Sequence, residues 1–522
     1  MKKIYLLLLI FHVAFVVKSQ GLFHKFYQQD NALGLLYRCA QTDNGGYISV
    51  GNVTDESTFS GDFLIVRANP DGSASWCKSL TLTDNEQFTD VVESAPGEFV
   101  VVGSVFSTTT FTSQIIVAKY NDSGSKIWCK MYSVNGSTVS ANRIQKDETG
   151  NIYILGMAEV AGASSDYLIM KLDGNGNILQ QSTIGTPVSD YPLSFLRNAQ
   201  GDLFIGGWAN SGTGETIHMI RLNASMELQW DSYLSGNARY FNYDMKEKSS
   251  GNIVIAGRYD NMNDSYDVLL AELDVQTGTP VWIKSYSASD GTASYAYGLA
   301  VGENDHIGVT GIIEGTLAGT LLFETDQDGV VNWSERISGT NETDAHGYGI
   351  CPDSDGGYVV CGKRSGDDNS VVQLLKSSNT GEVTCSTTDF PFNVTDLTPE
   401  IQHLTLTMNT GTLFAQDITL EEMMVTNFSD ACIETSVRSL NGNQLFDLYP
   451  NPSDGIIQVN LKEPTAGNCK VDLFDAQGIL VSSGEMSHAV SGPYKIPLEI
   501  PGIYFIRITN GNRSYTGKVI NF

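Results

Sequence analysis

Short apolar strands that end in glycine recur along most of the chain. Their sequences are GGYISVG (45–51), GEFVVVG (97–103), GNIYILG (150–156), GDLFIGG (201–207), GNIVIAG (251–257), DHIGVTG (305–311) and GGYVVCG (356–362). The closing glycines are 50 to 54 residues apart: Gly51, Gly103, Gly156, Gly207, Gly257, Gly311 and Gly362. Apolar strands at this period predict a repeat architecture built from small sheets.

A second signal follows in each unit: a strand, a glycine turn and another strand that carries a tryptophan. The tryptophans are Trp76, Trp128, Trp230, Trp282 and Trp333, and Gln180 and Thr384 occupy the position in the third and seventh units. Units of about four strands each predict an all-β, seven-bladed β-propeller over residues 20–385. The recurring tryptophan is expected to dock one blade on the next.

The start of the mature chain bears on how the ring closes. The segment FHKFYQQD (23–30) lies one repeat before SWCKSLTLTD (75–84). We therefore expect it to complete the seventh blade, which would remove an exposed sheet edge.

Beyond the repeats the pattern changes twice. Residues 386–444 predict a β-rich linker or extension, in which LTLTMNTGTLFAQDITL (404–420) suggests strands around a Thr/Gly turn. Cys385 and Cys432 frame this segment, either as a disulfide that pins it to the propeller or as two unrelated thiols. Residues 445–522 alternate apolar and polar positions between Pro, Gly and Asp turns, which predicts a small Ig-like β-sandwich.

The first residues have the features of a signal peptide. Lys2 and Lys3 precede an apolar run, and Val17 and Ser19 suit a cleavage site before Gln20. The run is too short for a transmembrane anchor, so residues 1–19 predict export. The net charge of −28 disfavours nucleic acid as a partner.

The C-terminal segment resembles a known family. Tyr449, Pro450, Asn451 and Pro452 are followed by Asp475 and Gly478, then Gly502 and Tyr504, then Lys518. This order is similar to the type A sorting domain of the type IX secretion system of the Bacteroidota. The resemblance implies recognition by the outer-membrane secretion machinery and a secreted or cell-surface location. The repeats resemble the SBBP-like repeats often found ahead of this domain.

No catalytic motif stands out, and we expect no metal site and no cofactor. HExxH, GxSxG and P-loop patterns are absent from the sequence. The turn DGNGN (173–177) lacks the glycine and glutamate positions of a calcium loop. AELDVQTGTPVW (271–282) resembles quinoprotein repeats, in which the pattern docks blades and does not hold the quinone.

Two function classes remain open. The first is a non-catalytic binding or adhesion module for a glycan or a protein, and the second is a secreted hydrolase or lyase with its active site on the top face of the propeller. The regular blades favour the binding module. Its candidate ligand residues are Trp208, Tyr259, Asp260 and Asn261, placed in loops after two closing glycines, although packing aromatics are common at such positions.

Overall fold

The computed structural model describes residues 21–521 with gaps. The residues left out are 29–31, 56–57, 59, 83, 135–136, 160–163, 211–214, 236–237, 261, 263–264, 316–317, 339–343, 366–369, 385–386, 411–412, 426, 431–445, 450–454, 462–468, 476–479, 487–493, 499, 501 and 511–512. The chain divides into two compact units, residues 1–431 and residues 432–522. The predicted signal peptide lies outside the described residues.

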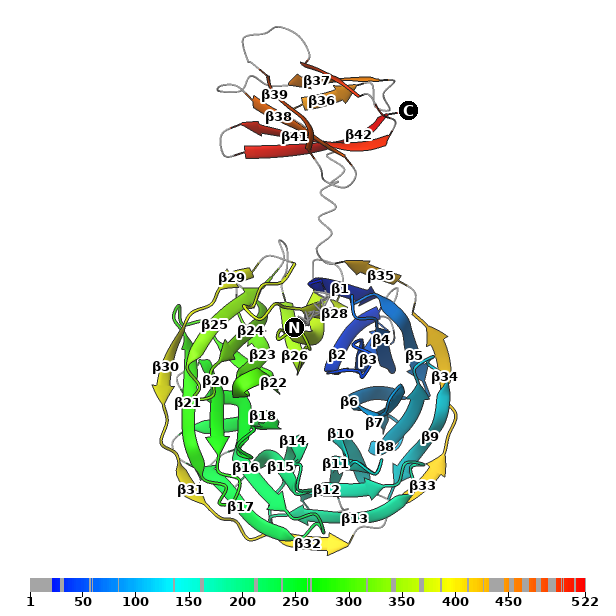
Figure 1. Cartoon of the computed structure of the whole chain (residues 1–522). Helices are drawn as coiled ribbons and strands as arrows, with labels where there is room; N and C mark the ends of the chain where they lie inside the picture. Colours follow the sequence, from blue (N-terminus) through cyan, green and yellow to red (C-terminus); the bar gives the residue numbers. More distant parts are fainter. Residues whose placement is uncertain are drawn as a thin grey trace, which may run out of the picture. The chain divides into compact units, whose positions relative to one another are not determined.

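The first unit is a ring of antiparallel sheets arranged like the blades of a propeller (Figure 1). Its strands, in chain order, are β1 (Phe23–Gln28), β2 (Ala32–Gln41), β3 (Tyr47–Asp55), β4 (Gly61–Ala68), β5 (Ala74–Thr81), β6 (Asn85–Ala95), β7 (Glu98–Ser107), β8 (Thr112–Asn121), β9 (Lys126–Ser133), β10 (Thr138–Lys146), β11 (Ile152–Glu159), β12 (Ser165–Leu172), β13 (Ile178–Gly185), β14 (Asp190–Arg197), β15 (Leu203–Asn210), β16 (Glu215–Leu222), β17 (Leu228–Ser235), β18 (Arg239–Glu247), β19 (Ile253–Asp260), β20 (Tyr266–Leu273), β21 (Pro280–Ala288), β22 (Ser294–Val301), β23 (Ile307–Ile313), β24 (Gly319–Thr325), β25 (Val331–Ile337), β26 (Asp344–Pro352), β27 (Tyr358–Ser365) and β28 (Ser370–Lys376). A 3₁₀ turn, η1 (Glu303–Asp305), precedes β23. The prediction of an all-β, propeller-like fold is confirmed.

Five of the sheets have five strands each, and a sixth sheet has ten. In the ten-stranded sheet, β22–β25 and the set β26, β27, β28 and β1 meet through a single residue pair, Ile312 and His346. Among the described residues, backbone pairing therefore joins the two sets at the end of β23 only.

A β-bulge in the innermost strand of each repeat explains why the repeat ends its second strand motif with a glycine. The bulged residues are Tyr37, Thr89, Asn142, Leu193, Tyr243, Tyr297 and Tyr348. The bulge brings a carbonyl group against the next strand, so a Cβ on Gly51 would collide with the carbonyl oxygen of Leu35. Only glycine leaves room for this approach, which explains why the residue recurs.

The recurring tryptophans dock neighbouring sheets, as predicted. The Trp76 ring packs on Gly124 of the next sheet, and its indole N–H donates to the Asp122 carbonyl at 2.8 Å. Trp128 makes the same pair of contacts with Gly176 and Gly174, with an indole bond of 3.2 Å. The glycine in the receiving turn leaves space for the ring.

The ring closes through its first strand. β1 pairs antiparallel with β28, so residues 23–28 complete the sheet of the last repeat, as expected. Phe23 packs on Gly72, the contact that the five recurring tryptophans make with the turn glycines of other repeats. The assignment of Thr384 to this position is wrong, because the fourth strand of the last repeat comes from the beginning of the chain and not from residues after β28.

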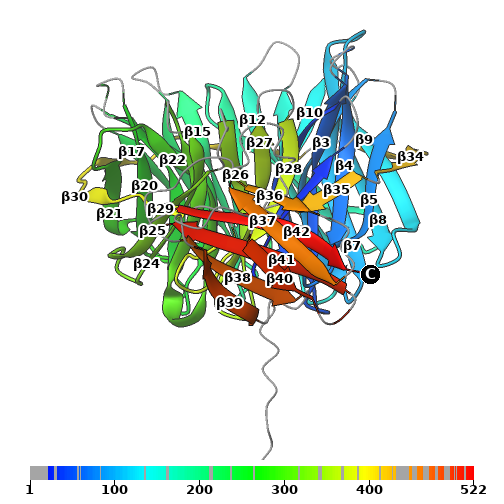
Figure 2. The ribbon, with the colours of Figure 1, turned by 90° about the horizontal axis from the view of Figure 1, so that it is seen from above.

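A belt of seven short strands surrounds the ring, and we define it as residues 387–430. Its strands are β29 (Thr387–Asp389), β30 (Phe392–Asp396), β31 (Glu400–Gln402), β32 (Thr407–Thr410), β33 (Phe414–Asp417), β34 (Glu421–Met424) and β35 (Asn427–Asp430). They pair with β25, β21, β17, β13, β9, β5 and β1, in the reverse order of the repeats. Figures 1 and 2 show the belt at the outer edge of the ring.

This arrangement corrects the expectation for residues 404–420. The two strands in this stretch, β32 and β33, do not pair with each other; they add to β13 and β9 of neighbouring sheets.

The belt and the residues just before it insert apolar side chains into the core clusters between sheets. The main anchors are Val383, which precedes the belt, and Phe390, Leu397, Leu406, Leu413, Leu420 and Val425 within it. Leu413, for example, is buried with Val102 and Val117 of the second repeat and Ile154 of the third. The belt therefore combines backbone pairing at the sheet edges with hydrophobic burial between the sheets.

The second unit contains two small sheets around one core. β36 (Phe446–Tyr449), β37 (Ile456–Leu461) and β40 (Tyr494–Pro497) form one sheet. β38 (Cys469–Asp475), β39 (Leu480–Met486), β41 (Gly502–Asn510) and β42 (Arg513–Asn521) form the other. Both contribute to a single hydrophobic cluster, in which Ile457 and Val459 of the first sheet join Val471, Leu473 and Ile506 of the second.

Candidate functional site

The structure places the predicted ligand aromatics in strands, which corrects their assignment to exposed loops. Trp208 lies in β15 and stacks on Tyr191 of β14, with ring centroids 4.0 Å apart. Tyr259 lies in β19, half-buried, with its ring 5.4 Å from that of Tyr240. Asp260 is buried and accepts the Met262 backbone N–H at 2.9 Å. The two ring contacts pack adjacent strands against each other, and the Asp260 bond holds the backbone that follows β19.

Two other predictions fall outside the described residues. Asn261, the fourth ligand candidate, is one of them. The disulfide suggested between Cys385 and Cys432 is the other, because neither residue is described. Both stay predictions.

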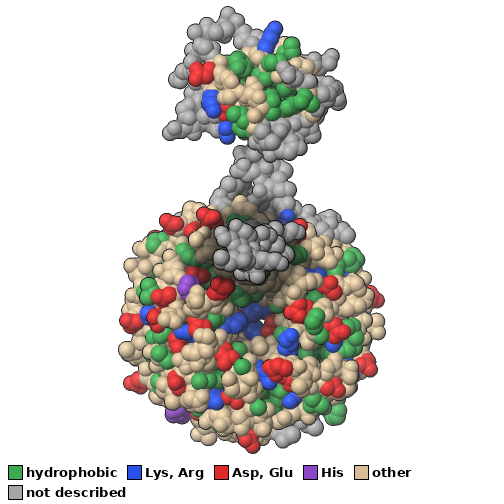
Figure 3. Space-filling view, viewed as in Figure 1, with side chains coloured by type: hydrophobic (Ala, Val, Ile, Leu, Met, Phe, Trp, Pro, Cys, Tyr) green, Lys and Arg blue, Asp and Glu red, His purple; other side chains and the backbone are tan. Residues whose placement is uncertain are grey.

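The centre of the ring holds a bridge of arginines. Arg143 of β10 donates to the Tyr243 carbonyl at 2.9 Å, and Arg38 of β2 donates to the same carbonyl at 3.3 Å and to the Tyr348 carbonyl at 2.6 Å. Burial and the nearby Arg38 charge lower the pKa of Arg143 to about 10. Figure 3 shows Lys and Arg side chains around the central opening. The Tyr243 carbonyl thus ties the first, third and fifth repeats together, and Arg38 also reaches the last repeat at Tyr348.

Carboxylates follow two of the bulges and link neighbouring sheets. Asp90 accepts the backbone N–H of Ile144 at 3.1 Å, and Asp244 accepts that of Leu299 at 3.0 Å. Burial raises the pKa of Asp90, whereas for Asp244 the charges of Lys246 and two arginines outweigh burial and lower it. These central charges therefore have structural partners within the ring.

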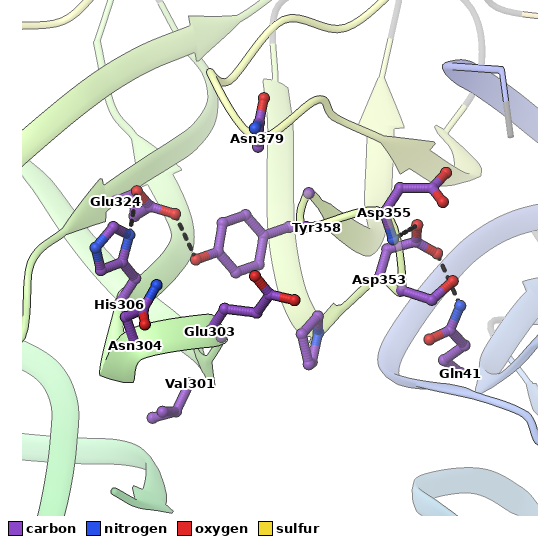
Figure 4. A pocket seen from close by; sticks show the side chains of 15 residues that line it. Gln41, Val301, Glu303, Asn304, His306, Glu324, Asp353, Asp355, Tyr358 and Asn379 are labelled. Atoms are coloured by element: carbon purple, nitrogen blue, oxygen red, sulfur yellow. Dashed lines mark hydrogen bonds and ion pairs between the residues drawn. The ribbon is translucent and has the colours of Figure 1, made fainter. Parts of the chain in front are cut away.

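A cavity of about 730 Å³ lies where the turns after β22 and β26 meet the end of β2. We call it the acidic pocket, because four carboxylates and no Lys or Arg line it (Figure 4). The carboxylates are Glu303, Glu324, Asp353 and Asp355. Amides of Gln41, Asn304 and Asn379, the His306 ring and the Tyr358 hydroxyl complete its polar wall.

One side of the acidic pocket is organised around Glu324 of β24. Its carboxylate accepts the Tyr358 hydroxyl at 2.8 Å and the Asn332 amide at 2.9 Å, and the His306 ring lies 3.1 Å away. Burial, and then the Glu324 charge, raise the pKa of the Tyr358 hydroxyl, so this group stays protonated and donates. The prediction of His306 as a hydrogen-bonded histidine agrees with this contact, although it precedes β23 and is not inside it.

The other side is organised around Asp353. It accepts the Tyr47 hydroxyl at 2.6 Å and the Gln41 amide at 2.8 Å, and it pairs with the buried Lys376 ammonium at 2.7 Å. Lys376 also reaches Asp355 at 2.8 Å. Burial acts to raise the pKa of Asp353, but Lys376 and Tyr47 outweigh it and lower the pKa. This carboxylate is therefore held in its charged form.

The turn that forms the floor of the acidic pocket has an unusual backbone. Asn304 and Asp305 have φ values of 56° and 57°, where the matching turns of several other repeats have a glycine such as Gly150 or Gly356. The Asp305 carboxylate accepts the Ser249 backbone N–H at 2.8 Å, a bond to the preceding sheet that offsets the strain. Glu303 is left exposed beside the cavity.

Sequence reasoning missed this pocket because its residues come from distant positions. Gln41 belongs to the first repeat, and Asp353 and Tyr358 belong to the last. A signal was present: the sixth repeat has Glu-Asn-Asp before His306 where the six others have a turn glycine before the strand. A position that departs from the repeat in this way is a candidate for a function that the equivalent positions of the other repeats do not have.

In the second unit, several sorting-motif residues lie on adjacent strands. Tyr504 of β41 is opposite Asp475 of β38 and Val519 of β42, and Lys518 is opposite Phe505. The Tyr504 hydroxyl donates to the Ile500 carbonyl at 2.7 Å. Gly502 begins β41, and Tyr449 ends β36 in the other sheet. Pro450, Asn451, Pro452 and Gly478 lie outside the described residues.

These strands can be compared with known proteins. Residues 447–521 match the secretion system C-terminal sorting domain. The match supports the type IX sorting domain inferred from the sequence, so the chain carries a signal for export to the cell surface or the medium. Within the described residues, no helix has the length and apolarity to cross a membrane. A search of the curated proteins found no match.

Solved structures resemble the chain only distantly. A protein of unknown function from Dyadobacter fermentans is 10% identical, with a TM-score of 0.40 over 57% of this chain and 96% of that one. A quinohemoprotein alcohol dehydrogenase from Comamonas testosteroni is 9% identical, with a TM-score of 0.36 over 70% and 78%. These similarities are too low to carry an argument about cofactor or activity.

Proposed function

We propose that this is an exported, non-catalytic binding protein and that its acidic pocket receives a cationic group, such as the Lys or Arg side chain of a polypeptide. The observation that carries the proposal is the lining of the pocket, which has four carboxylates and no Lys or Arg. Lys376 beneath the wall neutralises only part of this charge. An exposed Glu303 and a negatively charged surface attract cations toward the pocket.

The number of blades and the fold of the second unit are part of the same proposal. We take the ten-stranded sheet as two blades, which gives a seven-bladed β-propeller, and we take the second unit as Ig-like. The single residue pair between β23 and β26 supports the first point, and two sheets around one core support the second. We also propose that residues 1–19 are a signal peptide, that the repeats are SBBP-like and that the protein comes from the Bacteroidota.

The hydrolase or lyase alternative has one observation in its favour, the convergence of carboxylates and His306 in one cavity. A general acid needs a carboxyl group that stays protonated near neutral pH. Asp353 has the opposite property, since its pKa is lowered. Glu324 already accepts hydrogen bonds from the Tyr358 hydroxyl and the Asn332 amide, so its oxygens are engaged with partners inside the protein. The internal partners of the pocket therefore support binding over acid–base catalysis.

The test uses the full chain and the tripeptide Lys-Lys-Lys as the probe, with affinity measured by calorimetry at two salt concentrations. Glu303→Gln removes an exposed charge at the pocket, and Glu421→Gln removes an exposed charge on the belt as a matched control. We expect the first variant to weaken binding severalfold and the second to leave it unchanged, because charge attraction acts mainly within about 10 Å at 0.1 M salt. Equal effects of the two variants would contradict the proposal.

A further inference from the structure

A second cavity becomes apparent when equivalent positions of the repeats are compared. In each repeat, the residue after the closing glycine lies opposite a residue of the innermost strand. These cross-strand pairs are Leu35–Asn52, Gln87–Ser104, Ser140–Met157, Tyr191–Trp208, Phe241–Arg258, Tyr295–Ile312 and His346–Lys363. The last four pairs are large, whereas Gln87–Ser104 is small and polar.

Large pairs fill the space beside the inner strands. Tyr191 and Trp208 stack at 4.0 Å with their ring planes 16° apart. Arg258 lies 4.3 Å from the Phe241 ring centroid and 4.4 Å from that of Tyr266. These contacts occupy the volume that the repeat geometry provides at this position.

At the Gln87–Ser104 pair the same volume is open. A cavity of about 340 Å³ is lined there by residues of three successive repeats, and we call it the amide pocket. It lies at the opposite end of the strands from the acidic pocket, because it involves the hairpin between β7 and β8 and not the turns after β22 and β26. Its volume is near the lower end for ligand pockets, which run from about 300 to 1,000 Å³.

The lining of the amide pocket is almost entirely neutral and polar. The side chains are the amides Asn52, Asn85, Gln87 and Asn142, the hydroxyls Thr54, Thr89, Ser104, Ser113 and Ser140, and one carboxylate, Glu86. Amides and hydroxyls both donate and accept hydrogen bonds, which matches a ligand rich in hydroxyl groups. No Lys or Arg lines it, so the pocket does not suit phosphate or carboxylate ligands.

Some polar groups of the pocket wall have hydrogen-bond partners in the protein, and others have none among the described residues. Gln87 accepts the Tyr37 hydroxyl at 3.2 Å, and the Ser104 hydroxyl accepts the Ala141 backbone N–H at 2.9 Å. The amide oxygens of Asn52 and Asn142 have no hydrogen-bond partner among the described residues. Such atoms are costly unless water or a ligand satisfies them.

Two phenylalanines form an apolar rim beside the amide pocket. Phe106 lines the cavity and is 39% exposed, and Phe111, which is 75% exposed, lies with its ring centroid 6.4 Å from that of Phe106. Phe111 has a φ of 55°, a conformation that bulky residues seldom adopt. The hairpin thus holds an aromatic ring in solvent at a cost in backbone energy, which points to a use for the ring.

We infer that the amide pocket binds a neutral sugar, one ring of a glycan, whose hydroxyls meet the amides and whose apolar face stacks on Phe111 and touches the edge of the rim at Phe106, since the two rings are 67° apart. Sugars carry hydroxyls at their edge and C–H groups on their faces, and this combination matches a polar cavity with an aromatic rim. The site rests on the binding role proposed above, and it uses residues of a different pocket. An experiment can therefore contradict one of the two proposals without contradicting the other.

The experiment measures binding of neutral oligosaccharides of glucose, mannose and N-acetylglucosamine to the full chain by calorimetry. Phe111→Ala removes an exposed ring, and Phe414→Ala removes another exposed ring, 59% exposed, from β33 at the far edge of the same sheet. We expect at least one sugar to bind, Phe111→Ala to weaken it about tenfold, and Phe414→Ala to leave it unchanged.

A second variant, Gln87→Leu, replaces a polar group of the wall without removing bulk, and it is expected to abolish sugar binding. Circular dichroism and the thermal midpoint check that each variant is folded. The inference is overturned if no neutral oligosaccharide binds, or if Phe111→Ala and Gln87→Leu both retain the affinity of the original protein. Lys-Lys-Lys binding should be unaffected by either variant, which separates this result from the test of the acidic pocket.

Discussion

The repeat sheets and the belt are built from the same kind of element but are stabilised in different ways. Strands of the repeats are long and bury most of their residues; β23 and β24 are buried along their whole length. Belt strands have three to five residues, and every residue of β33 and β34 is exposed. The repeats are held by their own cores, whereas the belt is held by sheet edges and by anchors between its strands.

This difference shows how the outer edge strands of the ring are covered. An unpaired edge strand presents free N–H and C=O groups that can pair with another molecule. The belt strands occupy these positions on every sheet of the ring, and the belt ends on β1, the strand that closes it. Both β1 and the belt therefore join parts of the chain that are remote in sequence.

The largest expected effect comes from deleting the belt, residues 387–430, while keeping the sorting domain. The deletion exposes the outer sheet edges and removes six of the anchors. Since the loss of a buried Leu or Phe side chain costs about 2–5 kcal/mol, the loss of six anchors is comparable with or larger than the roughly 5–15 kcal/mol of a typical protein. We expect aggregation, measured by size-exclusion chromatography with light scattering.

A synthetic peptide of residues 387–430 provides the control for this deletion. If the belt acts by covering edges, adding the peptide during refolding should restore monomers. A deleted chain that stays monomeric without the peptide and keeps its thermal midpoint would show that the ring does not need the belt.

A smaller effect is expected from single changes within the belt, at two neighbouring residues. Leu413 is buried between sheets, and Phe414 is exposed on β33. Leu413→Ala should lower the free energy of unfolding by about 2–5 kcal/mol, and Phe414→Ala should change it by less than about 0.5 kcal/mol. Chemical denaturation of both variants measures this difference, and similar losses would mean that the belt is not held by its anchors.

The repeats could be predicted from the sequence and the belt could not, for a physical reason. Each repeat forms its hairpins locally, so the alternating strand, the closing glycine and the tryptophan all appear within about 50 residues. A belt strand such as β34 pairs with β5, more than 300 residues away, and its own side chains are exposed. The belt could have been recognised only from the spacing of its anchors, which is seven to nine residues from Phe390 to Leu420, and not from alternation within a strand.

The candidate sites were harder still to predict. Trp208 and Tyr259 were suggested because aromatic residues near loops can bind ligands, yet both pack against tyrosines of the adjacent strand. The two pockets arise where a repeat departs from its equivalents, at Asn304 in one case and at the Gln87–Ser104 pair in the other. Recognising these departures as cavities requires the cross-strand register, which the sequence does not contain.

A further prediction tests the repeats themselves. A Cβ at Gly103 would collide with the Gln87 carbonyl oxygen and approach the Phe88 backbone at 2.8 Å. Gly103→Ala should therefore destabilise the protein by about 1–3 kcal/mol, the usual cost of overpacking. Thermal unfolding measures it, and a neutral result would show that the bulge is not what requires the recurring glycine.

The smallest expected effect is a dependence of stability on pH, with opposite signs at two buried histidines. His218 lies between Asp190 and Asp231, at 3.5 and 3.7 Å, and Asp231 also accepts the Leu404 N–H of the belt at 2.7 Å. Burial acts to lower the pKa of His218, but the two carboxylates outweigh it and raise the pKa. His24 of β1 contacts Gln373, and burial and Arg364 lower its pKa to about 3.

The signs follow from proton linkage. The folded state holds a proton on His218 above pH 6.5, the ordinary value, where the unfolded chain releases it, so this contribution is lost as pH rises through the raised pKa. For His24 the unfolded chain binds the proton first, so stability is lost as pH falls from 6.5 toward about 3. His218→Gln should flatten the decline of the thermal midpoint above pH 6.5, and His24→Gln should flatten part of the decline below it. If His218→Gln left the alkaline limb unchanged, the histidine would not be a charged link between the fourth repeat and the belt.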